Sequence, residues 1–245
     1  MRLDVFLSEN AIVDSRTDAK KFITGGFVSV NQKTITKPSF DVVGDEDIVV
    51  DKSSKRYVSR GGLKLEGALD DFCVNVSGKV AIDIGASSGG FTDCLLQRGA
   101  KVVYAVDSGV GQMASHLRDD SRVYVFENYN ARYMELSHFA LRPSVAVMDV
   151  SFISATLIIP AVKNVLMPGG DFICLIKPQF EVGKGGLGKG GIVKNPSLRK
   201  QAVDRVLDSA VSCGFNVVKV IESPILGGSG NVEYLAHFVS KDDSL

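Results

Sequence analysis

Short runs of valine, isoleucine and leucine alternate with helical patterns from residue 79 onward. Most of these runs show no polar alternation, which predicts strands that are buried on both faces. Strands of this kind, separated by helices, are typical of a parallel sheet that is covered on both sides. The predicted strands are 79–85, 101–109, 122–128, 144–150 and 171–178, and the predicted helices are 89–99, 111–120, 155–166 and 197–214.

Two further strands, 215–224 and 232–239, complete the pattern, and the sequence between them is not helical. They are compatible with an antiparallel pair at the edge of the sheet, which is a common ending for such a sheet. The fold class predicted for this part of the chain is therefore α/β, with a mostly parallel sheet.

The first 51 residues have a different organisation. Ser15 is a plausible N-cap, and Gly25-Gly26 would end the helix that it starts. The predicted elements are helices over 3–10 and 15–26 and short strands over 27–31, 34–40 and 46–51. The polar residues that follow lack apolar periodicity and are predicted to form a linker before a helix over 63–72. The predicted division is thus a small domain (1–51), a linker (52–62) and a large domain (63–245).

Composition limits the class of protein. A hydrophobic content of 45% is ample for a packed core. The four cysteines are scattered without a CxxC motif, so they suggest neither a zinc site nor a disulfide framework and fit a reducing cytoplasm. No apolar run approaches the roughly 20 residues needed to cross a bilayer, so no stable membrane association is expected. The start of the chain is also a poor secretory signal.

A glycine-rich loop, GASSGG, follows the first strand of the large domain. It does not match the G-x-G-x-x-G fingerprint of dinucleotide sites. The later GKGGLGKG stretch lacks the Ser or Thr that ends a phosphate-binding Walker loop. Without further evidence, the first loop could be only a tight turn between a strand and a helix.

Three carboxylates support a cofactor site instead. Asp83, Asp107 and Asp149 end three of the predicted strands, and the carboxyl ends of parallel strands line the crevice where ligands bind. Gly85 would let the backbone approach an amino-acid moiety, Asp107 would accept hydrogen bonds from ribose hydroxyls, and Asp149 would face a cationic centre. These features together indicate S-adenosylmethionine. The predicted cofactor contacts are Asp83, Gly85, Ala86, Ser87, Ser88, Gly89, Asp107, Asn128 and Asp149.

Four polar residues at or near element ends could carry chemistry: Lys64, Asp149, Lys177 and Glu233. Taken singly, each could be a surface charge or part of an ion pair, and for Lys64 alone this is the favoured interpretation. The strand-end positions of Asp149 and Lys177 favour a function. The three histidines are dispersed, and no His, Cys or Asp cluster indicates a metal site.

Several long motifs resemble the TlyA family, the hemolysin A-like ribosomal RNA 2′-O-methyltransferases, and more distantly the FtsJ ribose methyltransferases. They are DIGASSGGFTDCLLQRGA, MDVSFIS, LIKPQFE, GKGGI and NVEYLAHF. The resemblance implies a Rossmann-like class I methyltransferase domain preceded by an α+β S4-like RNA-binding domain. The family's linker carries Arg-x-aromatic-Val, whereas this chain has Arg56-Tyr57-Val58 after a lysine, which leaves the role of the linker open.

The resemblance also implies a reaction and a Lys–Asp–Lys–Glu tetrad at Lys64, Asp149, Lys177 and Glu233. The substrate would be ribosomal RNA within ribosomal subunits, methylated on a cytidine ribose. A ribose 2′-hydroxyl must lose its proton as it attacks, and a neutral lysine can accept that proton or a cationic one can stabilise the oxyanion. Lys177 is the candidate, and Glu233 could orient the lysines or the ribose. No metal is needed, because the sulfonium already makes the methyl group electrophilic.

The formal net charge is zero, yet basic residues outnumber acidic ones in the first 37 residues. From charge alone, an ordinary mixed surface is the favoured interpretation. The family resemblance implies RNA contacts instead, and the predicted ones are Arg2, Arg16, Lys20 and Lys37, continued toward the active site by Arg56 and Arg60. Two rival functions stay open: a membrane-active hemolysin, and an RNA-binding ribosome assembly factor without catalysis.

Overall fold

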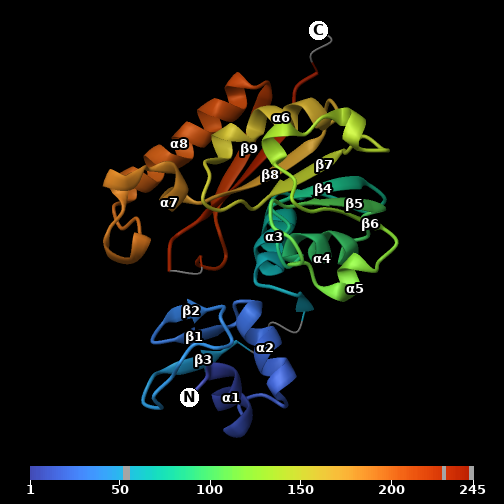
Figure 1. The fold of residues 1–245 in the computed structure, drawn as a ribbon. Coiled ribbons are helices and arrows are strands. Elements are labelled where there is room, and N and C mark those ends of the chain that lie inside the picture. Colours follow the sequence, from blue (N-terminus) through green and yellow to red (C-terminus); the bar gives the residue numbers. More distant parts are fainter. Residues whose placement is uncertain (52–55, 228–229, 243–245) are drawn as a thin grey trace.

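The structure, a computed structural model, describes residues 1–51, 56–227 and 230–242. Figure 1 shows a small N-terminal domain, in blue, below a larger domain built around one sheet. Part of the predicted linker, residues 52–55, lies outside the described residues.

The small domain packs two helices against a three-stranded antiparallel sheet of order β2-β1-β3. Its elements are α1 (Leu3–Glu9), α2 (Arg16–Thr24), β1 (Val28–Val30), β2 (Lys33–Ile35) and β3 (Ile48–Val50). Ser15 caps α2 as predicted, since its Oγ accepts a hydrogen bond from the backbone N–H of Asp18 at 3.1 Å. The core is apolar and includes Leu3, Leu7, Ile23 and Val28, all without exposed surface.

The second strand of this domain is shorter than the predicted 34–40. β2 ends at Ile35, because the following residues bond to the first helix instead of to β1. The carbonyl of Pro38 accepts the N–H of Asp4, and the carbonyl of Phe40 accepts the N–H of Leu3. Residues 38–40 thereby satisfy backbone donors at the start of α1.

The large domain contains a seven-stranded sheet of order β6-β5-β4-β7-β8-β10-β9. The first five strands of this order run parallel, and β10 runs antiparallel to both of its neighbours. The strands are β4 (Val80–Ile84), β5 (Val102–Val106), β6 (Val123–Phe126), β7 (Val145–Met148), β8 (Asp171–Ile176), β9 (Phe215–Glu222) and β10 (Tyr234–Ser240). The predicted α/β class, the mostly parallel sheet and the antiparallel final pair are confirmed.

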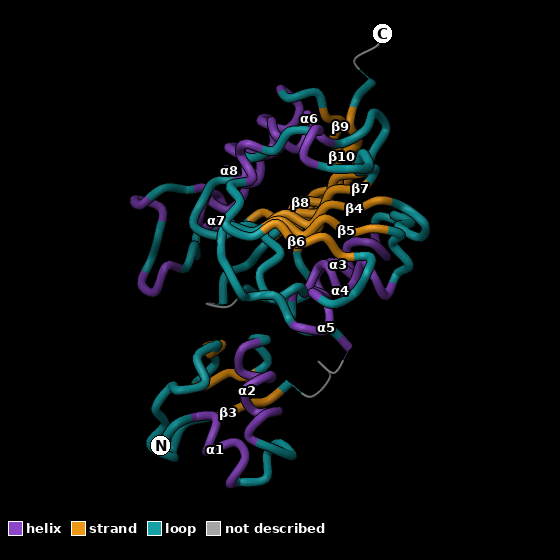
Figure 2. Tube along the Cα trace, turned by 45° about the vertical axis from the view of Figure 1, so that its right-hand side comes forward, coloured by secondary structure: helices purple, strands orange, loops and turns teal. Residues whose placement is uncertain are grey.

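Helices cover both faces of this sheet. Figure 2 shows α3, α4 and α5 on one side of the strands and α6 and α8 on the other. The helices are α3 (Gly61–Asp71), α4 (Gly90–Gln97), α5 (Ser115–Arg118), α6 (Ile159–Val165), α7 (Pro178–Glu181) and α8 (Pro196–Ser212). The predicted helix 111–120 is thus reduced to a single turn, and the four-residue α7 was not predicted.

The helix after the linker starts two residues earlier than the predicted Leu63. α3 begins at Gly61, and the ring of Tyr57 packs directly over its second residue. A Cβ on Gly62 would lie 2.3 Å from that ring, so this position accepts only glycine without rearrangement. The glycine pair therefore starts the helix under a buried aromatic ring.

Candidate active site

The carboxyl ends of three neighbouring parallel strands bring the predicted carboxylates to one edge of the sheet. Ile84 is in register with Val106 on β5 and with Met148 on β7. Asp107 and Asp149 directly follow those two strands. The structure therefore brings Asp83, Asp107 and Asp149 together, as strand ends in an open α/β sheet require.

Gly85 is needed for a close approach between two strand ends. Its φ is +85°, and a Cβ at this position would lie 2.2 Å from the backbone carbonyl oxygen of Asp149. A side chain would push the loop away from β7. The loop then continues through Ala86, Ser87 and Ser88 to Gly89, the N-cap of α4.

Asp107 holds the glycine-rich loop in place. Its Oδ2 accepts the N–H of Ser87 at 2.8 Å, and its Oδ1 accepts the N–H of Gly109 at 2.6 Å. An ionised carboxylate has about four acceptor positions, so two more hydrogen bonds can be accepted. Asn128, which follows β6, is exposed and donates its N–H to the carbonyl of Gly109.

Asp83 is fully buried at the end of β4. Thr92 donates a hydrogen bond to its Oδ2 at 2.7 Å, whereas Oδ1 has no partner among the described residues. Burial raises the pKa of the Asp83 carboxyl to about 7 against the effect of the Thr92 bond, and the nearby charge of Asp149 adds to the rise.

The four predicted catalytic residues form two ion pairs. Lys64 Nζ lies 2.6 Å from Glu233 Oε2, and Lys177 Nζ lies 2.6 Å from Asp149 Oδ1. Lys64 and Glu233 are almost completely buried. Tyr234 is paired with Ile176, so Glu233 and Lys177 each lie just outside the β8–β10 ladder. Each lysine thus has its own carboxylate.

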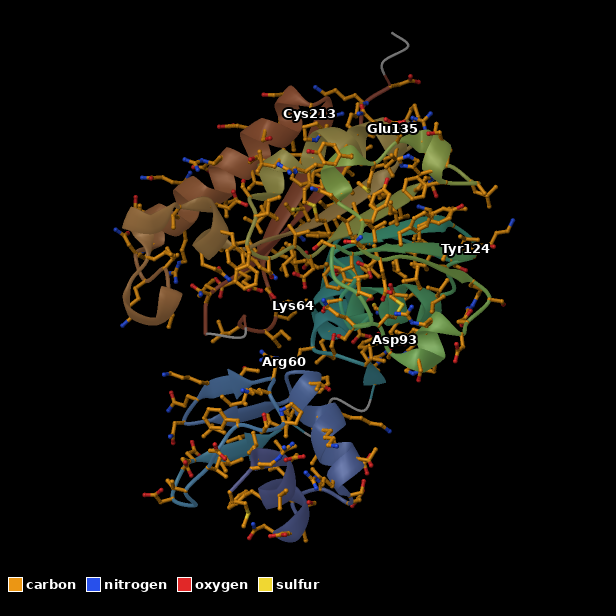
Figure 3. The ribbon with its side chains drawn as sticks, viewed as in Figure 1. Arg60, Lys64, Asp93, Tyr124, Glu135 and Cys213 are labelled. Carbon is orange, nitrogen blue, oxygen red and sulfur yellow. The ribbon has the colours of Figure 1, made fainter. Side chains whose placement is uncertain are left out.

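One member of each pair lines a cleft of about 190 Å³ between the domains. Lys64, Asp149 and the loop from Gly85 to Ser88 line it from the large domain. Gly25, Gly26, Thr34 and Thr36 line it from the small domain. Figure 3 shows Arg60 at the junction of the two domains, with Lys64 next to it on the side of the large domain.

Three residues near the two pairs were not predicted. Lys177 Nζ donates to Ser151 Oγ at 2.8 Å, and Gln179 Nε2 donates to Glu233 Oε1 at 3.3 Å. Phe152 has a φ of +64° and is 92% exposed, next to the ring of Phe180. An exposed phenylalanine in a left-handed conformation is uncommon. The motifs MDVSFIS and LIKPQFE contain all three, but nothing in their spacing marks these residues.

The predicted RNA contacts differ in their surroundings. Lys20 and Lys37 are exposed. Arg2 and Arg16 both bind Asp4, which is completely buried, at 2.9 Å and 3.0 Å. The hydrogen bond from Arg2 lowers the pKa of Asp4 to about 2, against the opposing effect of burial and with help from Arg16. Both arginines therefore stabilise the small domain, while about half of each side chain stays exposed.

The two basic residues of the linker region also bond within the protein. Arg56 forms an ion pair with Glu66 at 2.6 Å. Arg60 donates to Thr34 Oγ1 at 2.8 Å in the small domain and to the carbonyl of Leu226 at 2.6 Å in the large domain. Arg60 thus connects the domains, a role that its place in a polar stretch did not indicate.

The segment before α3, residues 56–58, is hydrogen-bonded to α4, the helix that follows the glycine-rich loop. The N–H of Val58 donates to Asp93 Oδ2 at 2.8 Å, and Gln97 Nε2 donates to the carbonyl of Arg56 at 2.7 Å. The hydroxyl of Tyr57 donates to Glu66 at 3.1 Å. The connection between the domains is therefore bonded to both α3 and α4.

Two kinds of feature, metal-ligand clusters and membrane-spanning helices, are not found in the described residues. Within 1–51, 56–227 and 230–242, no group of three or more His, Cys, Asp or Glu side chains could hold a metal ion. No helix in this part of the chain has the length and apolar character required to span a bilayer. The four cysteines are free.

Comparison with known families identifies the two domains. Residues 57–239 match the family described as FtsJ-like methyltransferase, and residues 1–48 match the S4 domain. The first match covers well over half of the chain. The chain belongs to the FtsJ-like methyltransferase family.

Within this family the relatives include TlyA proteins, which confirms the resemblance stated above. The chain is 43% identical to "Hemolysin A" of Brachyspira hyodysenteriae over 98% of its length and 100% of that protein. It is 41% identical to "16S/23S rRNA (cytidine-2'-O)-methyltransferase TlyA" of Mycobacterium tuberculosis, over 99% of this chain and 91% of that one.

Solved structures agree with the fold of this FtsJ-like chain. A candidate hemolysin from Streptococcus thermophilus has a TM-score of 0.79 and 44% identity, over 99% of this chain and 89% of that one. A Mesorhizobium loti S-adenosylmethionine-dependent methyltransferase has a TM-score of 0.55 and 16% identity, over 72% and 97% of the two chains. The second likeness concerns the methyltransferase fold alone.

Proposed function

We propose that this protein is an S-adenosylmethionine-dependent methyltransferase that modifies a cytidine 2′-hydroxyl in ribosomal RNA. The observation that carries the proposal is a cleft lined by the glycine-rich loop and by one member of each lysine–carboxylate pair, Lys64 and Asp149. The Mycobacterium tuberculosis relative, named as a 16S/23S rRNA (cytidine-2'-O)-methyltransferase, supplies the nucleotide and the RNA class.

The chemistry of the donor set fits the cofactor. The buried Oδ1 of Asp83 has no partner among the described residues, and Asp107 retains free acceptor positions. The loop from Gly85 to Gly89, together with Asp83, Asp107, Asn128 and Asp149, would hold the cofactor. When bound, S-adenosylmethionine supplies an electrophilic methyl group.

Lys177 is proposed to act on the proton of the 2′-hydroxyl. Asp149 and Ser151 hold its amine at 2.6 Å and 2.8 Å, so the nitrogen is fixed at the end of β8. A fixed amine can accept the proton of the attacking hydroxyl or stabilise the charge that develops on its oxygen. Lys64 lines the same cleft, and Glu233 holds its amine at 2.6 Å.

The small domain is proposed to dock the RNA, with residues 1–51 as the S4-like domain, 52–62 as the linker and 63–245 as the catalytic domain. Lys20 and Lys37 offer exposed charges for phosphates, and Arg2 and Arg16 are half exposed. Phe152 offers an exposed ring on which a base could stack next to the catalytic pairs.

The proposed substrate is ribosomal RNA within ribosomal subunits, and the proposed location is the cytoplasm, which fits the free cysteines.

The test of the proposed function is to incubate the purified protein and methyl-labelled cofactor with ribosomal subunits that lack the modification. Mapping should find label on a cytidine ribose, and Lys177→Ala should abolish most of it. Label on a base, or no label with either subunit, would contradict the proposal.

The name "Hemolysin A" of one relative raises a second candidate, a membrane-active protein. Dye release from liposomes by the pure protein tests it. Release that Lys177→Ala leaves unchanged would support a membrane activity that is independent of the cleft. An assembly factor without catalysis would instead bind RNA and cofactor and transfer no methyl group.

A further inference from the structure

Gln179 connects the two ion pairs of the cleft. It lies two residues after Lys177, with only Pro178 between them, and its side chain reaches the carboxylate of the other pair. The amide Nε2 must be the atom that faces Glu233, because an ionised carboxylate only accepts hydrogen bonds. The segment 177–179 therefore contacts Asp149 through one side chain and Glu233 through the other.

Glu233 is held from three directions. Its Oε2 faces Lys64 Nζ at 2.6 Å, and its Oε1 accepts from Gln179 at 3.3 Å. The backbone of Gly227 closes over Oε1, where an added Cβ would lie 2.2 Å from that oxygen. Since Glu233 is only 3% exposed, water cannot replace the amide of Gln179 as a donor without rearrangement.

Within the described part of the chain, the positive charges shown to act on Glu233 come from α3 and the residue before it. Lys64 faces it from α3, and Arg60 lies close enough, just before that helix, for the two charges to interact. Glu181, the acidic residue of α7, turns away and accepts from Ser154 Oγ and the N–H of Ala155. The amide of Asn231 bonds to Gly191 and Val193. Gln179 is thus the neutral donor on the α7 side.

We infer that Gln179 is a positioning residue of the methyl-transfer site, which fixes the orientation of Glu233 toward Lys64 through a neutral amide donor. The inference rests on the proposed function. The Lys64–Glu233 pair then has a fixed geometry relative to Lys177, because the segment 177–179 contacts both Asp149 and Glu233.

The variant Gln179→Glu tests this inference, because a glutamic acid can donate to Glu233 only when it is protonated. A protonated glutamic acid has the shape of glutamine and can donate to Glu233, whereas an ionised one places a second carboxylate next to the first. Two adjacent carboxylates share a proton, so one member of the pair titrates at a raised pKa. The variant should therefore resemble the wild type in acid and lose the contact as pH rises.

The first readout is single-turnover methylation of unmodified ribosomal subunits at saturating cofactor. We expect Gln179→Glu to be within about twofold of the wild type near pH 6 and about tenfold slower near pH 8.5, a rate loss that corresponds to about 1.4 kcal/mol. Gln179→Leu, which has a similar size but donates nothing, should be slow at both pH values and should bind the cofactor with unchanged affinity in calorimetry. The control, Gln201→Glu, adds the same charge at an exposed position of α8.

The second readout needs no activity. The melting temperature of ligand-free Gln179→Glu, relative to Gln201→Glu, should fall as pH rises, because the folded state binds a proton that the unfolded state releases. Equal melting curves for these two variants across the pH range would overturn the contact. A pH-dependent melting difference with wild-type rates for both Gln179 variants would overturn the positioning role. An inactive wild type would contradict the proposed function. The melting curves would then still test the contact between Gln179 and Glu233.

Discussion

Asp83→Asn should remove a pH dependence from the stability of the protein. Burial raises the pKa of the Asp83 carboxyl to about 7, whereas the ordinary pKa of an aspartate is 3.8. Between these two values the folded state keeps a proton that the unfolded state releases. The free energy of unfolding therefore falls as pH rises through this window, and the stabilisation is fully present only below it.

The size of the effect follows from the two pKa values. One pKa unit corresponds to about 1.4 kcal/mol, so this single group should cost the wild type about 2–3 kcal/mol between about pH 5 and pH 8. For a chain of this length the loss corresponds to a shift of about 5–10 °C in melting temperature. Asp83→Asn keeps an acceptor for the hydroxyl of Thr92 but has no proton to release in this range.

Thermal unfolding followed by circular dichroism, without cofactor, measures this difference. The wild type should lose melting temperature toward pH 8, and Asp83→Asn should lose less. Asp208→Asn, at an exposed position of α8, should parallel the wild type. If wild type and Asp83→Asn gave parallel curves, Asp83 would be ionised in the folded state, and the argument from burial would be refuted.

Substitutions at five other positions test the roles proposed for the cleft and the small domain. Lys177→Ala should slow methyl transfer by about 10²-fold or more in single turnover, and Lys177→Arg should not restore it if a base is required, since arginine stays protonated. Asp107→Ala should weaken cofactor binding by about 1.5–3 kcal/mol in calorimetry, and an unchanged affinity would exclude it from the site. Arg16→Ala and Lys37→Ala should each reduce the salt dependence of RNA binding by roughly one phosphate contact, and only the arginine variant should also lower the melting temperature. Phe152→Ala should weaken RNA binding by about 1–3 kcal/mol without changing cofactor affinity, as expected for one stacked base, and equal RNA affinity would exclude stacking.

The sequence predicts the strand ends well because they depend on one regular pattern. Buried parallel strands are continuous apolar runs, and a polar residue marks the point where each run ends, as at Asp107 and Asp149. The glycine at position 85 is predictable for the same reason, since a loop that leaves a central strand must pass close to its neighbour.

The partners of these polar residues are less predictable. Which carboxylate each lysine meets depends on the insertion of β10 between β8 and β9, and the periodicity of one strand does not give the order of a sheet. The burial of Asp4 is also not predictable from the sequence, because only the packing of α1 and α2 brings its two arginine partners to it. The sequence therefore predicts RNA contacts for Arg2 and Arg16 but does not predict their contact with Asp4.

The insertion of β10 also sets the time at which the enzyme can become complete during synthesis. Lys64 and Glu233 are 169 positions apart, and the strand that presents Glu233 is translated after every other strand of the sheet. A nascent chain that has folded β4 to β8 already carries the glycine-rich loop and Lys177, but it has neither Glu233 nor the partner strand for β9. Contacts between such distant segments form late. The Lys64–Glu233 ion pair therefore forms only when β10 enters the sheet. A nascent chain that still lacks β10 on its own ribosome holds only half of the active site.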